Sequence, residues 1–423
     1  MSGMQELLPT MQAEFNRLKA GIGEAFQKHG FLQIETPTIE RNEILLAKAG
    51  GDTEKQIYKV VKTAELANDA DQALRFDHTV PLARYTVEHM NDLCFPFKVT
   101  QIGRNFRGER AQRGRFREFY QCDVDVVGRN SLAVAYDAEV IATLAEAIRT
   151  LPLPSFVVRI SNRKLLSGML EELNLEQHAD EIFGIVDHAE KVPPTKTVAA
   201  LEELNIGSEN VVKITTFMGL NGDYREVLQR LREFGFQNAT FQTGIAELEE
   251  VFITLEKLDT EVEARADMLI VRGLDYYTGT VFETIAPDYR EIGSICSGGR
   301  YENLAGYYTD QKLPGVGGSI GLTRLFYILQ NYGLVEANDL KPIDVCLVPF
   351  SEAEYSSVAR LADKLRADGK SVDIVLSDKR LGDKMKYAAK TAKYVAVLGE
   401  DEIKSGEYKL RDLESGEETV QEL

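Results

Sequence analysis

The stretch from Arg104 to Gln121, RNFRGERAQRGRFREFYQ, is densely basic and separates two segments with strand character. Its flanks, CFPFKVTQIG and FYQCDVDVVG, are rich in β-branched and aromatic residues, so we expect two antiparallel strands joined by a basic loop. The net charge of the chain is −18, and a local excess of positive charge therefore indicates a bound anion. Planar guanidinium groups suit bidentate phosphate contacts, whereas a solvated face usually mixes lysine with glutamate. The arginines are Arg104, Arg107, Arg110, Arg113, Arg115 and Arg117.

Length and composition limit the class of protein. At 423 residues the chain exceeds what one hydrophobic core usually serves, so two or three domains are expected. The fractions of apolar (44%) and charged (27%) residues are those of an ordinary soluble globular protein. No run of about eighteen apolar residues occurs, and MSGMQELLPT lacks the layout of a signal peptide, so we expect a cytoplasmic protein.

The cysteines and histidines give no indication of a metal centre. The four cysteines lie far apart, without C-x-x-C spacing, and the five histidines form no H-x-x-x-H pair. We therefore expect no metal ion that is held by the protein alone.

Hydrophobic periodicity divides the chain into domains. Residues 1–325 alternate helices and strands in an α+β pattern, interrupted by a leucine- and glutamate-rich helical insertion at 165–260. Strand character returns in ADMLIVRGLDYYTGTVFETIA, which predicts a hairpin turning near Thr278–Gly279. A linker at 326–340 precedes a small α/β domain at 341–423, where short apolar strands alternate with helices.

Three further segments contain candidate binding residues, and each also has a purely structural interpretation. In RFDHTVPLARY, Asp77 and Thr79 share one face of an extended segment and could bind an ammonium group, although a capped turn explains them equally. Strand alternation in VRGLDYYTG predicts that Tyr276 and Tyr277 point to opposite faces, one toward a ligand. A basic segment near the C-terminus is typical of a solvated helix face; it contains Lys379, Arg380, Lys384, Lys386 and Lys390.

Taken together and in order, these segments resemble the class II aminoacyl-tRNA synthetases, and specifically the histidyl-tRNA synthetases. GFLQIETPTIE is similar to motif 1, FRGERAQRGRFREFYQCDVDVVG to motif 2, and GGRYENL with PGVGGSIGLTRL to motif 3. VRGLDYYTGTVFE is similar to the peptide distinctive of the histidine enzymes. The resemblance implies an antiparallel catalytic sheet for ATP and histidine, an inserted helical domain that contacts the tRNA acceptor arm, and a C-terminal anticodon-binding domain. It also implies a homodimer.

The resemblance assigns ATP contacts to matching positions. Arg107 would bind the α-phosphate and the histidine carboxylate, Glu109 the adenine amino group, and Arg115 the γ-phosphate. Phe119 and Arg324 would enclose the adenine ring. ATP would enter with Mg²⁺ bound to its phosphates.

The resemblance also assigns catalytic, amino-acid and tRNA contacts. Arg272 would approach the α-phosphate opposite Arg107, so that two cations flank the phosphorus. The α-amino group would be bound by the Asp77 region and the imidazole by Asp125 with Tyr277. In full, the histidine-binding residues would be Asp77, Thr79, Arg107, Gln121, Asp125, Arg272, Tyr276 and Tyr277. Gln112 and Arg117 would contact the 5′ guanylate of histidine tRNA.

Two other functions stay open at the level of sequence. Synthetase-like regulators bind histidine or uncharged tRNA without catalysis, among them the partner subunit of ATP phosphoribosyltransferase, which lacks the C-terminal domain and the histidine-specific peptide. A synthetase for threonine, proline or glycine would have a similar C-terminal domain but not the tyrosines of VRGLDYYTG. The chain also departs from the common family pattern at four positions, Asp77, His78, Asp125 and Thr323.

Overall fold

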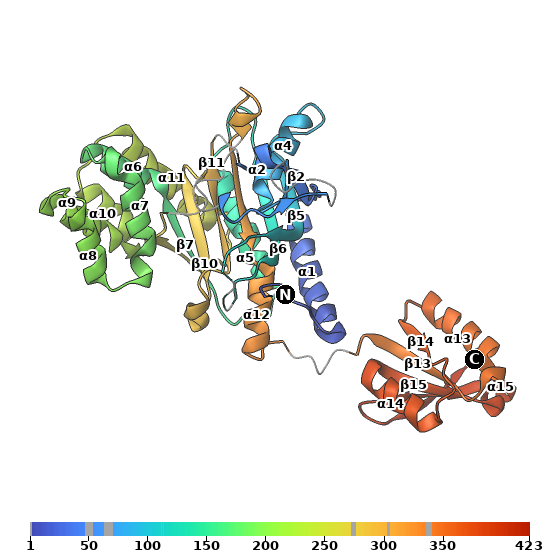
Figure 1. The fold of residues 1–423 in the computed structure, drawn as a ribbon. Coiled ribbons are helices and arrows are strands. Elements are labelled where there is room, and N and C mark those ends of the chain that lie inside the picture. The colour runs from blue at the N-terminus through green and yellow to red at the C-terminus, as the bar shows by residue number, and fades with distance from the viewer. Residues whose placement is uncertain are drawn as a thin grey trace. The chain divides into compact units, whose positions relative to one another are not determined.

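The computed structural model describes residues 2–46, 54–62, 71–110, 112, 114–271, 276–302, 305–335 and 341–423. Its internal contacts divide the chain into two units (Figure 1). One unit comprises Met1–Gln5 with Leu18–Leu334, and the other comprises Glu6–Arg17 with Val335–Leu423.

A nine-stranded sheet forms the centre of the first unit. Its strand order is β1-β5-β6-β12-β11-β10-β7-β9-β8. The pairs from β5 to β7 are all antiparallel, whereas β1 with β5 and β7 with β9 are parallel, which confirms the expected antiparallel catalytic sheet. The strands are β1 (Leu32–Gln33), β5 (Phe97–Phe106), β6 (Glu118–Val127), β7 (Val157–Asn162), β8 (Asn221–Gly222), β9 (Ala264–Asp267), β10 (Thr280–Ile285), β11 (Cys296–Tyr301) and β12 (Gly315–Ile320).

Helices and a small second sheet complete the catalytic part of this unit. Helix α5 contacts β6, β11 and β12, and helix α12 contacts β6, so both pack against the central strands. A three-stranded sheet has the order β2-β4-β3. These elements are α1 (Pro9–Lys28), which belongs to this unit from Leu18 onward, β2 (Ile39–Arg41), α2 (Asn42–Leu46), β3 (Lys59–Val60), β4 (Gln72–Leu74), α4 (Thr79–Glu88), α5 (Ala135–Arg149), η4 (Pro287–Ile292), η5 (Ala305–Tyr307) and α12 (Leu322–Asn331).

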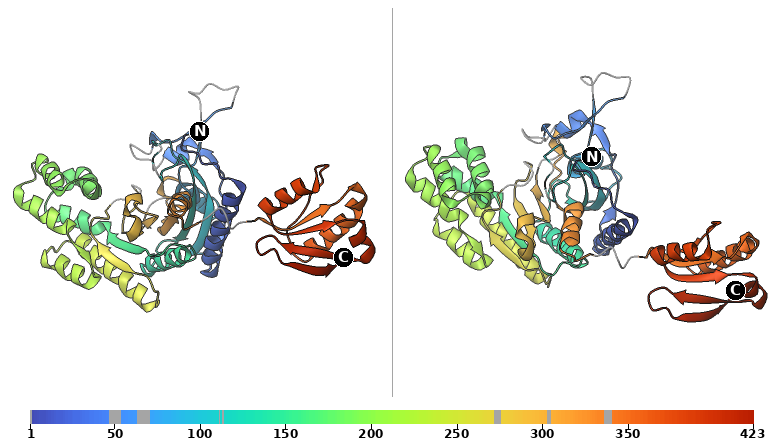
Figure 2. Two further views of the ribbon diagram at one scale, coloured as in Figure 1. Left: turned by 90° about the horizontal axis from the view of Figure 1, so that it is seen from below. Right: turned by 60° about the horizontal axis from the view of Figure 1, so that its bottom comes forward.

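Six helices between Arg163 and Lys257 form the predicted helical insertion. The views in Figure 2 agree that they gather beside the end of the sheet that contains β7 and β9. Helix α10 shows why such sequence folds as a helix: Asp223 caps its first turn and its apolar positions face inward. The elements are α6 (Arg163–Glu172), η2 (Glu176–His178), α7 (Ala179–His188), η3 (Ala189–Lys191), α8 (Pro194–Glu203), α9 (Ser208–Met218), α10 (Tyr224–Glu233) and α11 (Ala239–Lys257).

The predicted hairpin at Thr278–Gly279 is wrong. β9 and β10 are not neighbours, because β7 lies between them and pairs with both. Local alternation indicated β10 correctly, but β9 ends at Asp267 and residues 268–271 are not in a strand. The pairing of both strands depends on β7, more than a hundred residues earlier in the chain.

The second unit contains the predicted C-terminal α/β domain, a five-stranded sheet of order β14-β13-β15-β16-β17. Two buried apolar clusters, one around Leu347 and one around Cys346, cover opposite faces of β13. The hairpin of β16 and β17 extends the sheet beyond the predicted strands. The elements are β13 (Ile343–Pro349), η7 (Glu352–Glu354), α13 (Tyr355–Ala367), β14 (Val372–Ile374), α14 (Leu381–Thr391), β15 (Ala392–Leu398), α15 (Glu400–Ser405), β16 (Glu407–Asp412) and β17 (Glu418–Glu422).

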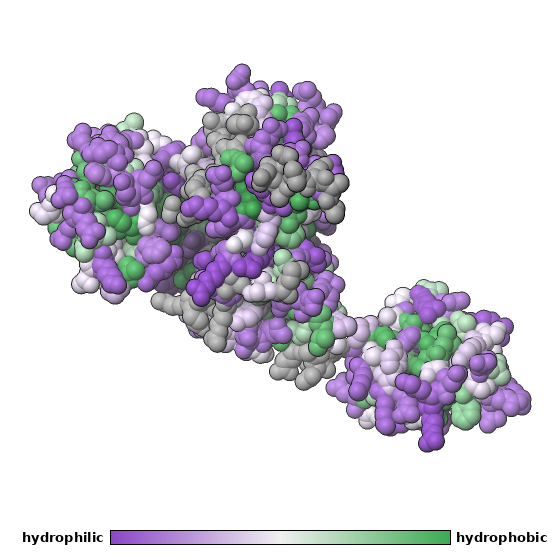
Figure 3. Space-filling view, viewed as in Figure 1, coloured by the Kyte–Doolittle hydropathy of each residue, from purple (hydrophilic) through white to green (hydrophobic). Residues whose placement is uncertain are grey.

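The basic segment near the C-terminus is only partly a surface feature. Lys384 is buried and donates a hydrogen bond from Nζ to the Pro349 carbonyl at 2.9 Å. The exposed members are Lys379, Arg380, Lys386 and Lys390. Hydrophilic residues predominate on the visible face of each unit (Figure 3). In the part of the chain that the structure describes, no helix is both long and apolar enough to cross a membrane.

Candidate active site

The basic loop joins β5 to β6, as the sequence predicts. The two strands pair from Phe97 opposite Val127 to Phe106 opposite Glu118, and the loop closes on a bridge between Gln112 and Arg115. Gln112 is exposed at this bridge. Arg113 lies outside the described residues.

The loop borders a cleft of about 1360 Å³ in the first unit. The cleft extends from the basic loop across the sheet toward the helical insertion, where Glu190 and Lys191 line it. It therefore contains all five residues that the resemblance assigns to ATP, two of those assigned to histidine and one assigned to tRNA. The predicted site residues that line it are Arg107, Glu109, Gln112, Arg115, Phe119, Gln121 and Arg324.

Two fixed arginines lie in the cleft. The Arg107 guanidinium is 5.2 Å from the centroid of the Phe119 ring, and its Nε donates to the Phe76 carbonyl at 3.1 Å. Arg324 donates from Nε to the Gly114 carbonyl at 3.1 Å and from Nη1 to the Ser294 carbonyl at 2.7 Å. Burial, with the nearby Arg115 charge, lowers the pKa of Arg324. Both guanidinium groups are thus held in place by backbone carbonyls.

Three other arginines of the basic stretch have partners within the protein. Arg115 Nη1 lies 3.3 Å from Glu109 Oε2, so the residues assigned to the γ-phosphate and to adenine are paired with each other. Arg117 Nε donates to the Glu109 carbonyl at 3.0 Å. Arg104, which has no assigned role, pairs with Glu118 at 2.9 Å.

Strand β6 presents a row of polar side chains on one face. Gln121, Asp123 and Asp125 alternate with buried Cys122 and with buried Val124 and Val126, as period-two geometry requires. In the register with β12, Ser319 lies opposite Asp123, and Gly317 lies opposite Asp125. The polar face belongs to the site and the apolar face belongs to the core.

Asp77 and Thr79 lie at the start of helix α4, and the predicted extended segment is therefore wrong at Thr79. Asp77 Oδ1 accepts a hydrogen bond from the Val80 amide at 3.0 Å, so the capped-turn interpretation is confirmed. Its Oδ2 accepts one from the Tyr276 hydroxyl at 3.4 Å. Burial raises the pKa of Asp77 to about 6, although the Val80 amide and the charge of Arg107 oppose the shift.

Asp125 is fixed by a residue that the sequence did not single out. Its Oδ1 accepts a hydrogen bond from the Tyr301 hydroxyl at 3.1 Å. Burial, reinforced by the Asp123 carboxylate, raises the pKa of Asp125 well above its ordinary value. A side chain at Gly317 would place Cβ 1.9 Å from Asp125 Oδ1, so only glycine leaves room for this carboxyl group.

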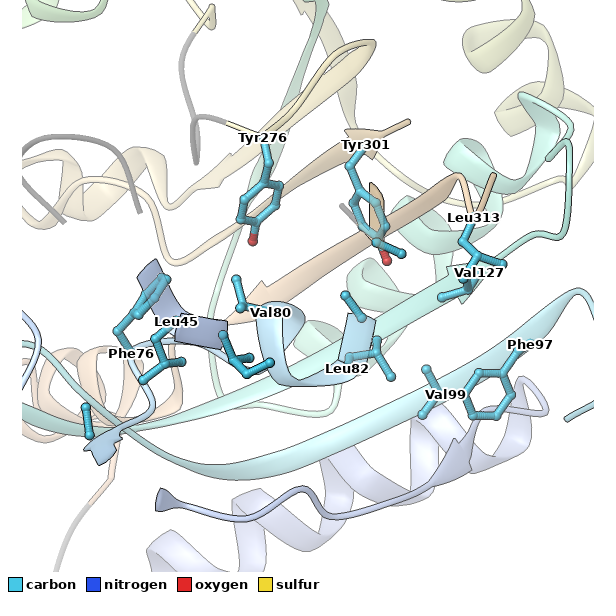
Figure 4. Close-up of a cluster of buried hydrophobic side chains, with 14 residues drawn as sticks. Leu45, Phe76, Val80, Leu82, Phe97, Val99, Val127, Tyr276, Tyr301 and Leu313 are labelled. Atoms are coloured by element: carbon cyan, nitrogen blue, oxygen red, sulfur yellow. The ribbon is translucent and has the colours of Figure 1, made fainter. Parts of the chain in front are cut away.

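The prediction that Tyr276 and Tyr277 point to opposite faces is wrong. Their ring centroids lie 5.0 Å apart, and both pack in one cluster with Tyr301. Strand alternation does not apply, because β10 begins only at Thr280. Figure 4 shows the hydroxyl groups of Tyr276 and Tyr301 directed to the same side, toward Val80 and Leu82.

Thr323, one of the departures from the family pattern, joins two elements of the site. Its Oγ1 accepts a hydrogen bond from the Tyr120 amide at 2.7 Å. Tyr120 follows Phe119 on β6, and Thr323 precedes Arg324 on α12, so this bond links the strand and the helix that carry the two predicted adenine contacts.

The structure therefore brings the predicted residues into two adjoining groups. One lines the cleft, and the other surrounds the buried aspartates; Arg107 and Gln121 connect them. Arg272 lies outside the described residues. Tyr301, Ser319 and Gly317 were not predicted individually, and their position within the quoted motif 3 segments is the only sequence signal that indicates them.

Comparisons with known proteins cover the whole chain. The family model described as histidyl-tRNA synthetase matches residues 3–325, and that of the anticodon binding domain matches residues 344–422. A protein of Clostridium tetani (strain Massachusetts / E88) named "Histidine--tRNA ligase" is 42% identical over 427 residues, covering 100% of this chain and 95% of that protein. The crystal structure of histidyl-tRNA synthetase from Nostoc sp. PCC 7120 has a TM-score of 0.88 and 36% identity, covering 100% of this chain and 96% of that one.

A more distant structure shares the fold. It is described as an ATP phosphoribosyltransferase regulatory subunit/histidyl-tRNA synthetase from Bacillus halodurans C, with a TM-score of 0.77 and 22% identity. It covers 94% of this chain and 97% of that one. At this identity the likeness concerns the fold alone.

Proposed function

The chain belongs to the histidyl-tRNA synthetase family, and from this premise we propose how its residues carry out the reaction. It is a histidine–tRNA ligase, an ATP-dependent aminoacyl-tRNA synthetase that joins histidine to its tRNA. The observation that carries the proposal is that the candidate nucleotide site and the candidate amino-acid site adjoin each other. A cleft with fixed arginines adjoins a buried group of aspartates, and Arg107 lies where they meet.

The first step forms histidyl-adenylate. The histidine carboxylate attacks the α-phosphorus of ATP, and the bond to pyrophosphate breaks. The nucleophile is already ionised, so no protein base is needed. Arg107 and Arg272 would flank the phosphorus and stabilise the charge that develops on its oxygens. Arg107 suits this role because its guanidinium is anchored to the Phe76 carbonyl in the cleft.

The nucleotide would lie between Phe119 and Arg324, with Glu109 on the adenine amino group and Arg115 on the γ-phosphate. Arg324 is held by two carbonyls and Phe119 faces the same cleft, which supports this placement. Glu109 and Arg115 pair with each other in the structure, so ATP would have to separate them. Mg²⁺ would arrive on the phosphates.

Histidine recognition would use charge and hydrogen bonding. Asp77, Thr79 and Gln121 would bind the α-amino group, and Asp125 with Tyr277 would bind the imidazole, with Tyr276 beside them. Burial raises the pKa values of both Asp77 and Asp125, so a nearby positive charge would stabilise their ionised forms. The ammonium group of the substrate would supply it. An apolar amino acid would leave these buried groups unpaired and would be rejected.

In the second step, the 3′-hydroxyl of the terminal adenosine of tRNA would attack the activated carbonyl, releasing AMP. Gln112, exposed at the loop bridge, and Arg117 would contact the tRNA. We further propose residues 1–325 as the catalytic domain, 165–260 as its acceptor-arm insertion and 341–423 as the anticodon-binding domain. The predicted linker at 326–340 is wrong at its start, because helix α12 continues to Asn331 and Phe326 is buried. A cytoplasmic homodimer is the expected form.

The alternative, a regulator without catalysis, has less support. The regulatory subunit match shares the fold at 22% identity, whereas the curated relatives named "Histidine--tRNA ligase" match along the full chain at about 42%. The chain also matches the anticodon binding domain.

Pyrophosphate exchange into ATP, measured with each amino acid in turn, tests the function. We expect exchange with histidine alone. A profile without any amino-acid dependence would favour the regulatory alternative.

An Arg272→Ala variant tests the assigned catalytic pair. It should fold and bind histidine with ordinary affinity, yet lose most adenylate formation, because one of two cations at the phosphorus is removed; a loss of about 100-fold or more in exchange rate is expected. Equilibrium binding of histidine provides the control. Exchange at the wild-type rate would contradict the role of Arg272.

A further inference from the structure

His78 lies between Asp77 and Thr79 of the proposed amino-group site, but its ring contacts Asp123 on strand β6. The His78 side chain is 1% exposed, and its Nδ1 lies 3.0 Å from Asp123 Oδ2. With the Asp123 carboxylate as acceptor, this bond requires an N–H donor at His78 Nδ1. The His78 carbonyl in turn accepts a hydrogen bond from Gln101 Nε2 at 3.2 Å. Both the backbone and the ring of His78 are therefore attached to the sheet.

The contact continues from Asp123 to the proposed substrate ligand Gln121. Ser319 Oγ donates to Asp123 Oδ1, and Gln121 Nε2 donates to the same Ser319 oxygen at 2.6 Å. Strand register places these groups together, because Ser319 is the direct partner of Asp123 across β12 and β6. One continuous chain of hydrogen bonds thus runs from His78 through Asp123 and Ser319 to Gln121.

We infer that His78 is a positioning residue for the α-amino group of the amino acid substrate. Through Asp123 and Ser319 it fixes the Asp77–Thr79 segment and the Gln121 amide in one arrangement, so that ligands from the start of α4 and from β6 converge on the same ammonium group. This inference rests on the proposed roles of Asp77, Thr79 and Gln121.

The polarity of His78 distinguishes this role from simple packing. Its Nε2 is buried and, within the described ranges, has no hydrogen-bond partner. An apolar residue of similar size would fill the same volume without leaving a buried nitrogen unpaired. The polar contact of the ring is therefore the hydrogen bond from Nδ1 to Asp123.

The experiment compares His78→Leu with His78→Asn in histidine-dependent pyrophosphate exchange by the full-length protein. Leucine removes the donor, whereas the asparagine amide places an N–H close to the position of Nδ1. We expect His78→Leu to raise the KM for histidine about ten-fold, with kcat and the KM for ATP within about two-fold of wild type. His78→Asn should restore the KM for histidine to within about two-fold. His89→Leu, an exposed histidine at the other end of α4, is the matched control and should behave as wild type.

Ser319→Ala breaks the same chain at another point and should also raise the KM for histidine selectively, which keeps the test valid if His78→Leu does not fold. An unchanged KM for histidine in folded His78→Leu overturns the inference, and so does an equal rise in His78→Leu and His78→Asn. Absence of histidine-dependent exchange in the wild-type protein would instead contradict the proposed function, so the two failures are distinguishable.

Discussion

The ionised form of Asp77 opposes folding, although it is the form proposed to bind the substrate ammonium group. Burial raises its pKa to about 6 from an ordinary value of 3.8. Because the folded-state pKa is the higher one, the folded protein binds this proton more tightly than the unfolded chain does. The resulting stabilisation is greatest below pH 4 and is lost as the pH rises through 6.

An Asp77→Asn variant should therefore be more stable but inactive. At pH 8 we expect its free energy of unfolding to exceed that of wild type by about 2–3 kcal/mol, and the difference to fall toward zero near pH 4. Histidine-dependent exchange should be lost, because the amide cannot pair with the ammonium group. Denaturant unfolding at both pH values checks the first expectation. A variant less stable than wild type at pH 8 would contradict it.

The sequence indicated individual site residues better than it indicated the side chains that hold those residues in place. Arg107, Phe119 and Arg324 were predicted to share a site, and they line one cleft. The bond from Tyr301 to Asp125 was not predicted, because Tyr301 lies far along the chain and meets Asp125 only through the sheet. Motif resemblance thus indicated residues that line one cleft, whereas contacts among side chains required the strand register.

Contacts between elements set the geometry of the nucleotide site. The hydrogen bond from the Tyr120 amide to Thr323 attaches α12 to β6 beside the proposed adenine contacts. Thr323→Val keeps the shape of the buried side chain but removes the acceptor, so we expect a loss of about 1–2 kcal/mol in the free energy of unfolding. The KM for ATP should rise about three-fold while that for histidine stays constant. Steady-state exchange kinetics measure both; an equal rise in the two would refute this separation of roles.

At the level of elements, periodicity indicated strands such as β5, β6 and β10, but it did not give their partners in the sheet. The β5–β6 pair was correct because its strands are neighbours in sequence and share a short loop. The β9–β10 hairpin was wrong, since β7 enters the sheet between them. Tyr276 and Tyr277 were misplaced for a related reason: they precede the strand whose alternation was applied to them. Long-range pairing leaves little trace in local sequence.

The two units have separate apolar cores, which allows their contributions to be measured separately. Clusters around Leu347 and Cys346 belong to the second unit, whereas the cleft and the aspartates belong to the first. A fragment of residues 1–334 should keep histidine-dependent exchange within a few-fold of the full chain. Its kcat/KM for tRNA charging should fall at least about 100-fold, which corresponds to about 2.7 kcal/mol of lost tRNA interaction. Charging at the full-length rate would argue against an anticodon-binding role for the C-terminal domain.

The alternation along β6 has a consequence for how enzymes of this type can diversify. Odd-numbered positions from Gln121 to Asp125 lie on the face of the proposed amino-acid site, and the even-numbered positions between them face the core. We therefore expect mutations that alter the preferred amino acid at the odd-numbered positions of β6. Mutations that alter core packing are expected at its even-numbered positions. Substitutions at the odd-numbered positions can therefore change which amino acid is bound, while the apolar side chains at the even-numbered positions keep their packing in the core.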